Sequence, residues 1–226
     1  APALVHSLAH AWFRSSHVWL DEGVPEFMSL VWLERTQGRD AALKQLQAQV
    51  NTLALAEPAA KDGVVSGGES LIDATGEVYY RTKAAAVLGM LRGIVGDAAL
   101  KNALQTYLYA GKDDADPEAF ERVLEASARR DLRWFFNDWV YRDRGLPDLT
   151  IADVTPRLLE SSGPKGVSWL VSVDVRNNGD AAAEVPVTVR AGDLTMTQRL
   201  RIPAQSDAST RFIFPGVPHE VLVNDG

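Results

Sequence analysis

The hydrophobic residues of this chain change their spacing once, near Gly145-Leu146-Pro147, and this change constrains the fold more than any other feature. Before it, apolar residues recur with the roughly 3.6-residue period of an amphipathic helix. After it, they alternate with polar residues, which is typical of half-buried strands. We therefore predict an α+β protein with two domains, a helical bundle over residues 1–148 and a small immunoglobulin-like β-sandwich over residues 149–226.

The first domain is predicted to be helical over residues 2–14, 78–95 and 97–109 and around residues 43–53. A further helix, marked by Val24, Phe27, Met28 and Val31, ends at about Arg35, and two more begin at Asp116 and Asp131. Gly38 and Gly96 follow two of these segments, at a position that favours glycine. The run KAAAVLGMLRGIV is too uniformly apolar for a surface helix, so it predicts a buried central one. The Gly-rich stretch EPAAKDGVVSGGES predicts an exposed loop.

The second domain shows the alternation most clearly in Val167, Trp169, Val171, Val173 and Val175. The sequence Asn-Asn-Gly-Asp at residues 177–180 then predicts a hairpin turn. Further short strands are predicted over residues 185–189, 194–202, 210–214 and 221–223.

Composition excludes several classes of function. The formal net charge is −7 and the basic residues are scattered, so a nucleic-acid partner is not expected. No stretch contains the roughly 18 uninterrupted apolar residues of a membrane-spanning helix. The chain has no Cys, so a bound metal would need His and carboxylate ligands. Because the first residue is Ala1 and not Met, we expect that a preceding part of the same protein exists.

One group of residues has the spacing of a metal site. His6 and His10 are four positions apart on a predicted helix, so both imidazoles project from one face. Such a pair also occurs in helices that bind no metal, and the prediction therefore depends on a third ligand. Glu22 lies near the start of the next helix, where it can face the pair. Two imidazoles and one carboxylate suit a single zinc ion with an open fourth position.

These motifs resemble a known family. HSLAHAWF followed by WLDEG is similar to the zinc-binding segment of the gluzincin aminopeptidases, the family of aminopeptidase N and leukotriene A4 hydrolase, which carries HExxH and WLNEG. VYYRTKAAAVLGMLRGIVGDAALKNALQTYL and DLRWFFNDWVYRDRGLPDL resemble two later helices of the same family, so the resemblance covers about Leu4 to Leu149.

The resemblance implies the helical subdomain of a thermolysin-like catalytic domain, followed by a small sandwich. It also implies one zinc ion bound by His6, His10 and Glu22, and hydrolysis of a peptide or protein substrate by metal-activated water.

The first departure is Ser7, which stands at the position where the resemblance implies the Glu that acts as the general base. A serine hydroxyl cannot act as a base at neutral pH, because general-base catalysis needs a pKa near the operating pH. Glu26, one turn beyond Glu22, is a less favoured substitute. The chain is therefore either a zinc peptidase or an inactive homologue that binds peptides or assembles with other proteins.

A shorter connection between His10 and Glu22 is the second departure. His17 lies in this connection, either as a residue outside the ligand set or as a fourth ligand that closes the site. Together with Asp21 and Glu26, it is a candidate for the residues that support the ligands. Asp21, Glu26 and Glu77 are also acidic candidates for binding a substrate amino terminus, since the family's Gly-x-Met-Glu-Asn strand is not in this chain.

The third departure concerns the family's transition-state tyrosine. In the family, this tyrosine lies two residues before a Lys, and that Lys aligns with Lys83. Arg81 stands at that position. Tyr80 is the nearest tyrosine and Tyr79 the next, and either could polarise the scissile carbonyl. Two alternatives stay open: both tyrosines pack at the helix start, or Arg81 takes the role. Independently of the metal, the β-sandwich could act as a binding module through its loops.

Overall fold

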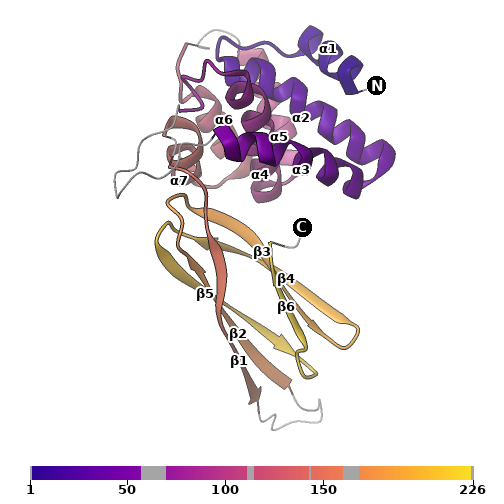
Figure 1. Cartoon of the computed structure of the whole chain (residues 1–226), viewed down its shortest axis with the longest axis vertical. Coiled ribbons are helices and arrows are strands. Elements are labelled where there is room, and N and C mark those ends of the chain that lie inside the picture. The colour runs from indigo at the N-terminus through magenta and orange to yellow at the C-terminus, as the bar shows by residue number, and fades with distance from the viewer. Residues whose placement is uncertain (1, 57–69, 111–114, 143, 160–167, 225–226) are drawn as a thin grey trace. The chain divides into compact units, whose positions relative to one another are not determined.

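A computed structural model describes residues 2–56, 70–110, 115–142, 144–159 and 168–224. The chain divides into two compact units, the first ending at Arg144 and the second beginning at Gly145. All described helices belong to the first unit and all described strands to the second, so the protein is α+β (Figure 1). Most of the predicted Gly-rich loop, residues 57–69, lies outside the described residues, as does Val167.

The first unit is a bundle of helices. Its elements are α1 (Pro2–Trp12), α2 (Val18–Gln37), α3 (Arg39–Ala56), η1 (Val78–Lys83), α4 (Ala84–Val95), α5 (Asp97–Ala110), α6 (Ala119–Ala128), α7 (Arg133–Phe136) and η2 (Asn137–Tyr141). Gly38 and Gly96 end α2 and α4 with φ angles of 89° and 84°, a conformation that other residues rarely adopt.

The core of this unit forms around α4, the helix predicted to be buried. Five of its side chains are at most 1% exposed, namely Ala84, Ala85, Val87, Leu88 and Leu91. Most of them are small or unbranched at Cβ, so neighbouring helices can approach α4 closely. Among these neighbours is α2, which carries one of the predicted metal ligands.

Aromatic rings fix the connection between α1 and α2 to the rest of the bundle. Phe13, in this connection, stacks on Tyr107 of α5, with ring centroids 6.3 Å apart. Tyr107 and Trp19 each meet Phe120 of α6 edge to face. Phe13 and Trp19 are therefore core residues, whereas Trp12 is 43% exposed.

Two helix starts differ from the sequence prediction. The buried helix does not begin as an α-helix at residue 78, because η1 forms a wider π-helical turn there before α4. The helix predicted from Asp116 begins at Ala119, and Pro117 lies in the turn before it. Asp116 Oδ1 instead accepts a hydrogen bond from the backbone N–H of Glu118 within that turn.

The second unit contains two antiparallel three-stranded sheets that share one core. One sheet has the order β1 (Leu149–Leu159), β2 (Ser168–Asn177), β5 (Ser206–Phe214), and the other β4 (Leu194–Ile202), β3 (Ala183–Ala191), β6 (Glu220–Val223). Inward-facing Val residues of β2 and β3 pack with Phe212 and Phe214 of β5 and Ile202 of β4. This arrangement is a small β-sandwich. The hairpin predicted at residues 177–180 is wrong, because β2 and β3 on either side of this turn belong to different sheets.

Strand β1 was not predicted. It lies at a sheet edge, paired with β2 alone, and most of its residues are exposed. An edge strand with little burial has no alternating apolar pattern, and it tolerates Pro156. The hydrophobic periodicity that reveals the inner strands is therefore missing here.

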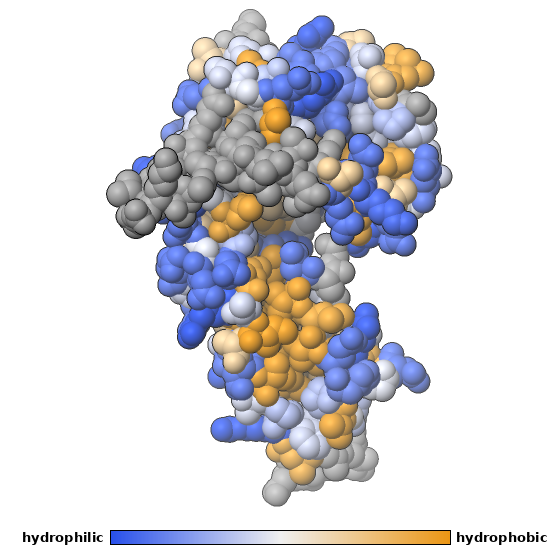
Figure 2. Space-filling model, in the orientation of Figure 1, coloured by the Kyte–Doolittle hydropathy of each residue, from blue (hydrophilic) through white to orange (hydrophobic). Residues whose placement is uncertain are grey.

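None of the described helices has the length and hydropathy needed to cross a membrane. Figure 2 shows that apolar residues gather on the viewed face of the β-sandwich, with hydrophilic residues around them.

Candidate metal site

Helices α1 and α2 run antiparallel, and hydrogen bonds fix their alignment at both ends. At one end, Ser29 on α2 donates a hydrogen bond from Oγ to the carbonyl oxygen of Pro2 (3.1 Å). At the other, Asp21 Oδ1 accepts a hydrogen bond from the backbone N–H of Ser15 (3.0 Å). The short connection between the helices therefore still allows them to pack against each other.

This alignment brings the three predicted ligands together. The Nε2 atoms of His6 and His10 lie 3.1 Å apart. Glu22 Oε2 lies 3.5 Å from His6 Nε2 and 3.6 Å from His10 Nε2. The imidazoles are 10% and 18% exposed and the carboxylate 30%, so the group is half-buried with one side open to solvent. Among the described residues, His6, His10 and Glu22 are the group whose His and carboxylate atoms lie close enough together to hold one metal ion.

The donor atoms fit a tetrahedral zinc ion. Zinc bonds to His nitrogen and carboxylate oxygen are about 2.0–2.2 Å long, which in a tetrahedron separates the ligand atoms by about 3.3–3.6 Å. The three observed distances, 3.1, 3.5 and 3.6 Å, are close to this range. Three donor atoms at such distances can bind one cation.

Glu26 lies on the opposite edge of the His6 ring. Its Oε2 is 3.2 Å from His6 Nδ1, a contact of ion-pair distance that lacks hydrogen-bond geometry. A carboxylate on this edge favours a proton on Nδ1 and leaves Nε2 free to bind a metal. Glu26 thus contacts the edge of the His6 ring opposite Nε2, and its support of a metal ligand stays a prediction.

Arg81 reaches the same group from η1. Its Nη2 lies 3.0 Å from His6 Nε2, and its Nε lies 3.7 Å from Glu26 Oε2. Its Nη1 donates a hydrogen bond of 2.6 Å to Glu77 Oε1. A guanidinium thus stands next to a ligand atom, at the position that aligns with the family tyrosine.

Ser7 provides no base at the site. Its side chain is exposed, and its hydroxyl donates a hydrogen bond to the carbonyl oxygen of Ala3 within the same helix (3.0 Å). Serines commonly make this bond to the preceding turn of a helix.

Asp21 and His17 lie away from the ligand atoms. Asp21 orders the connection between α1 and α2 through Ser15 and an ion pair of 3.7 Å with Arg14. His17 precedes the first turn of α2, where its carbonyl oxygen accepts hydrogen bonds from the backbone N–H groups of Leu20 and Asp21. It does not belong to the group of three ligands.

The two tyrosines differ in what the structure describes. Tyr80 lies in η1, where its backbone N–H donates to Gly76, and its phenol is not among the described contacts of His6, His10 or Glu22. The side chain of Tyr79 lies outside the described residues.

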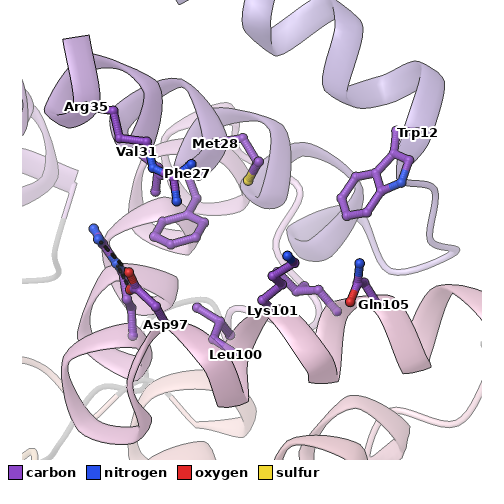
Figure 3. Close-up of a pocket in the computed structure, with 11 residues that line it drawn as sticks. Trp12, Phe27, Met28, Val31, Arg35, Asp97, Leu100, Lys101 and Gln105 are labelled. Carbon is purple, nitrogen blue, oxygen red and sulfur yellow. Dashed lines mark hydrogen bonds and ion pairs between the residues drawn. The ribbon is translucent and has the colours of Figure 1, made fainter.

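A separate apolar pocket lies between α2 and α5, with a volume of about 350 Å³. Figure 3 shows Phe27, Met28 and Val31 of α2 on one side, and Leu100 and Lys101 of α5 on the other. The pocket shares no lining residue with the three metal ligands.

The order of these motifs matches a family model. Residues 1–139 match the peptidase family M1 domain, and this match spans more than half of the chain. The chain belongs to the peptidase M1 family. The family resemblance read from HSLAHAWF and WLDEG is therefore confirmed.

A solved structure shows the same fold over nearly the whole chain. A crystal structure of Legionella pneumophila aminopeptidase A in complex with aspartic acid is similar with a TM-score of 0.62 and 17% sequence identity. The similarity covers 98% of this chain and 25% of that one. The M1 chain described here thus spans a quarter of the length of that protein.

Arg81, which the sequence left open as an alternative to the two tyrosines, lies next to His6. The signal was its position two residues before Lys83, where the family has tyrosine. An arginine at this position differs from the family tyrosine, so the neighbouring Tyr79 and Tyr80 were the favoured candidates for the tyrosine's role.

Proposed function

We propose that this chain is an M1 peptidase-like domain that binds one zinc ion through His6, His10 and Glu22 and holds peptides without hydrolysing them. The convergence of the three ligand atoms at 3.1–3.6 Å carries the first part of the proposal. The hydroxyl of Ser7, turned toward its own helix, carries the second.

Zinc suits this donor set better than other common divalent ions. Two neutral imidazoles and one carboxylate form a ligand set of catalytic zinc sites, whereas magnesium and calcium prefer oxygen ligands alone. Zinc, when bound, acts as a Lewis acid and lowers the pKa of a bound water. The protein contributes the orientation of the imidazoles, through the contact of Glu26 with His6.

The proton transfers of peptide hydrolysis need a group that this site does not provide. Neither an alcohol such as Ser7 nor a permanently charged guanidinium such as Arg81 accepts a proton at neutral pH. The carboxylate of Glu26 already contacts the Nδ1 edge of His6. Binding of a peptide can persist without turnover, because ground-state affinity does not depend on the general base.

Metal content tests the proposal first. We expect about one zinc per chain by inductively coupled plasma mass spectrometry, and none in a His6→Ala, His10→Ala double variant. His17→Ala is the matched control, since it removes an imidazole outside the ligand group and should leave the zinc content unchanged. Zinc at the level of the double variant in the unmodified chain would contradict the metal site.

Turnover is tested separately with aminoacyl p-nitroanilides and peptides. We expect no hydrolysis above the double variant, because the general base is absent. Release of p-nitroaniline by the unmodified chain that depends on His6 and His10 would overturn the proposal of an inactive domain. Activity gained by Ser7→Glu would show that only the base had been lost.

A further inference from the structure

Arg81 is the cationic side chain closest to the ligands in the described part of the chain. Its guanidinium lies within hydrogen-bond distance of His6 Nε2 and at ion-pair distance from Glu26. The side chain is 36% exposed, so it lies at the border between the site and solvent. This position is chemically unusual, because a metal and a guanidinium at one nitrogen atom repel each other.

With zinc bound, the site would therefore have a net positive charge. A divalent ion with two neutral imidazoles and the carboxylates of Glu22 and Glu26 has no net charge, and Arg81 adds one positive charge once Glu77 no longer pairs with it. Two adjacent cationic centres favour an anionic ligand that contacts both. A carbonyl oxygen, which is the ligand of a peptidase site, would neutralise neither.

An anionic ligand can replace Glu77 as the partner of Arg81. Glu77 is 65% exposed and pairs with Arg81 one helical turn away. An exposed pair of this kind contributes little to stability, so the guanidinium is readily available to a competing carboxylate. The planar guanidinium fork also matches the two oxygens of a carboxylate.

We propose that Arg81 and the metal held by His6, His10 and Glu22 form a carboxylate-binding pair, and that the peptides held here carry a carboxylate at the site. This inference rests on the proposed function, since it needs a metal at the three ligands. The carboxylate comes either from an acidic side chain or from a peptide C-terminus, and the site recognises the chemistry common to both.

The substitution Arg81→Met gives two effects of opposite sign. Removal of the cation beside His6 strengthens zinc binding, by about tenfold. The same removal weakens carboxylate binding by about tenfold or more, since a charge-assisted hydrogen bond is lost. A damaged fold would instead weaken both. Arg81→Lys keeps the charge without the fork, so it should leave zinc affinity near that of the unmodified chain and still weaken carboxylate binding.

The experiment uses the cobalt(II)-substituted chain, whose visible spectrum changes when a ligand enters the metal coordination sphere. Zinc affinity is measured in parallel by competition with a chelator. Two probes separate the carboxylate sources: an N-acetylated, C-amidated peptide with one Asp, and an N-acetylated peptide without acidic side chains but with a free C-terminus. Arg133→Met is the matched control, because it removes an exposed arginine from α7 that pairs with Asp131.

Saturable spectral change with at least one probe, weakened by Arg81→Met and unchanged by Arg133→Met, is the expected result. If the chain binds metal but carboxylate affinity is the same with and without Arg81, the inference is overturned and the proposed metal site stands. If the chain binds no metal, the proposed function and the inference fail together. The zinc measurement thus distinguishes the two failures.

Discussion

Gly23 and Ala84 touch where α2 crosses α4. A β-carbon added at Gly23 would lie 2.5 Å from the β-carbon of Ala84, a distance that requires one helix to move. Gly23 directly follows the ligand Glu22, so this close approach also determines where that carboxylate stands relative to His6 and His10.

Gly23→Ala is therefore expected to destabilise the helical unit by about 1–3 kcal/mol, the usual cost of overpacking a core. It should also weaken zinc binding, because α2 carries Glu22. Gly89→Ala in α4 is the matched control, since a β-carbon there meets nothing within 4 Å. It should be stabilising by about 0.5–1 kcal/mol, as for Gly to Ala in a helix interior. Urea unfolding of both variants measures the difference, and equal stabilities would contradict the role of the contact.

Glu26→Gln tests the support of His6. The carboxylate lies 3.2 Å from Nδ1 and restricts the orientation of the ring, so we expect its loss to weaken zinc binding by about 10- to 100-fold. The fold should be retained, because Gln has nearly the same shape. Glu118→Gln, directly before α6, is the control, an exposed carboxylate paired with Arg122. Chelator competition measures both affinities, and an unchanged zinc affinity in Glu26→Gln would show that His6 needs no such support.

The ligand triad could be predicted from the sequence because it follows from helix geometry. An i, i+4 pair on one helix and a carboxylate at the start of the next converge whenever the helices pack antiparallel. The stops at Gly38 and Gly96 and the inner strands of the sandwich were predictable for the same reason, since each depends on local pattern.

Arg81 could not be placed in the same way. Each residue of a helix rotates the side-chain direction by about 100°, so a single wider turn decides which of two neighbours faces the ligands. The π-helical turn of η1 is not encoded in the apolar pattern. Strand β1 was missed for a related reason, because its exposed residues carry no periodicity.

Asn177, at the end of β2, holds the start of the β-sandwich together. Its buried side chain accepts hydrogen bonds from the backbone N–H groups of Asp148 and Gly179, and donates to the carbonyl oxygens of Ala181 and Pro203. Asn177→Ala leaves these backbone groups without their partner, at a cost of about 3 kcal/mol.

Asn178→Ala is the control for this change, because Asn178 is exposed. Amide hydrogen exchange gives a local measurement: protection of β2 and β5 should fall in Asn177→Ala, while that of α4 is retained. If protection is equal in the two Asn variants, the Asn177 network does not stabilise the sandwich.

Glu121 makes the stability of the helical unit depend on pH. Burial raises the pKa of its carboxyl, and the hydrogen bond of 2.6 Å donated by Tyr141 only partly opposes this. Between the ordinary Glu pKa of about 4.3 and the raised value, the folded chain keeps a proton that the unfolded chain releases. The stabilisation is therefore complete below the ordinary pKa and is lost as the pH rises through the raised one.

Two variants test this dependence in opposite directions. Glu121→Gln cannot ionise and still accepts the hydrogen bond of Tyr141, so its stability relative to the unmodified chain should rise as the pH increases from 4 to 8. Tyr141→Phe removes a bond that favours the charged carboxylate, which raises the pKa of Glu121 further and extends the loss of stability to higher pH. Urea unfolding across this range measures both. A difference between Glu121→Gln and the unmodified chain that does not vary with pH would show that Glu121 ionises alike in the folded and unfolded states.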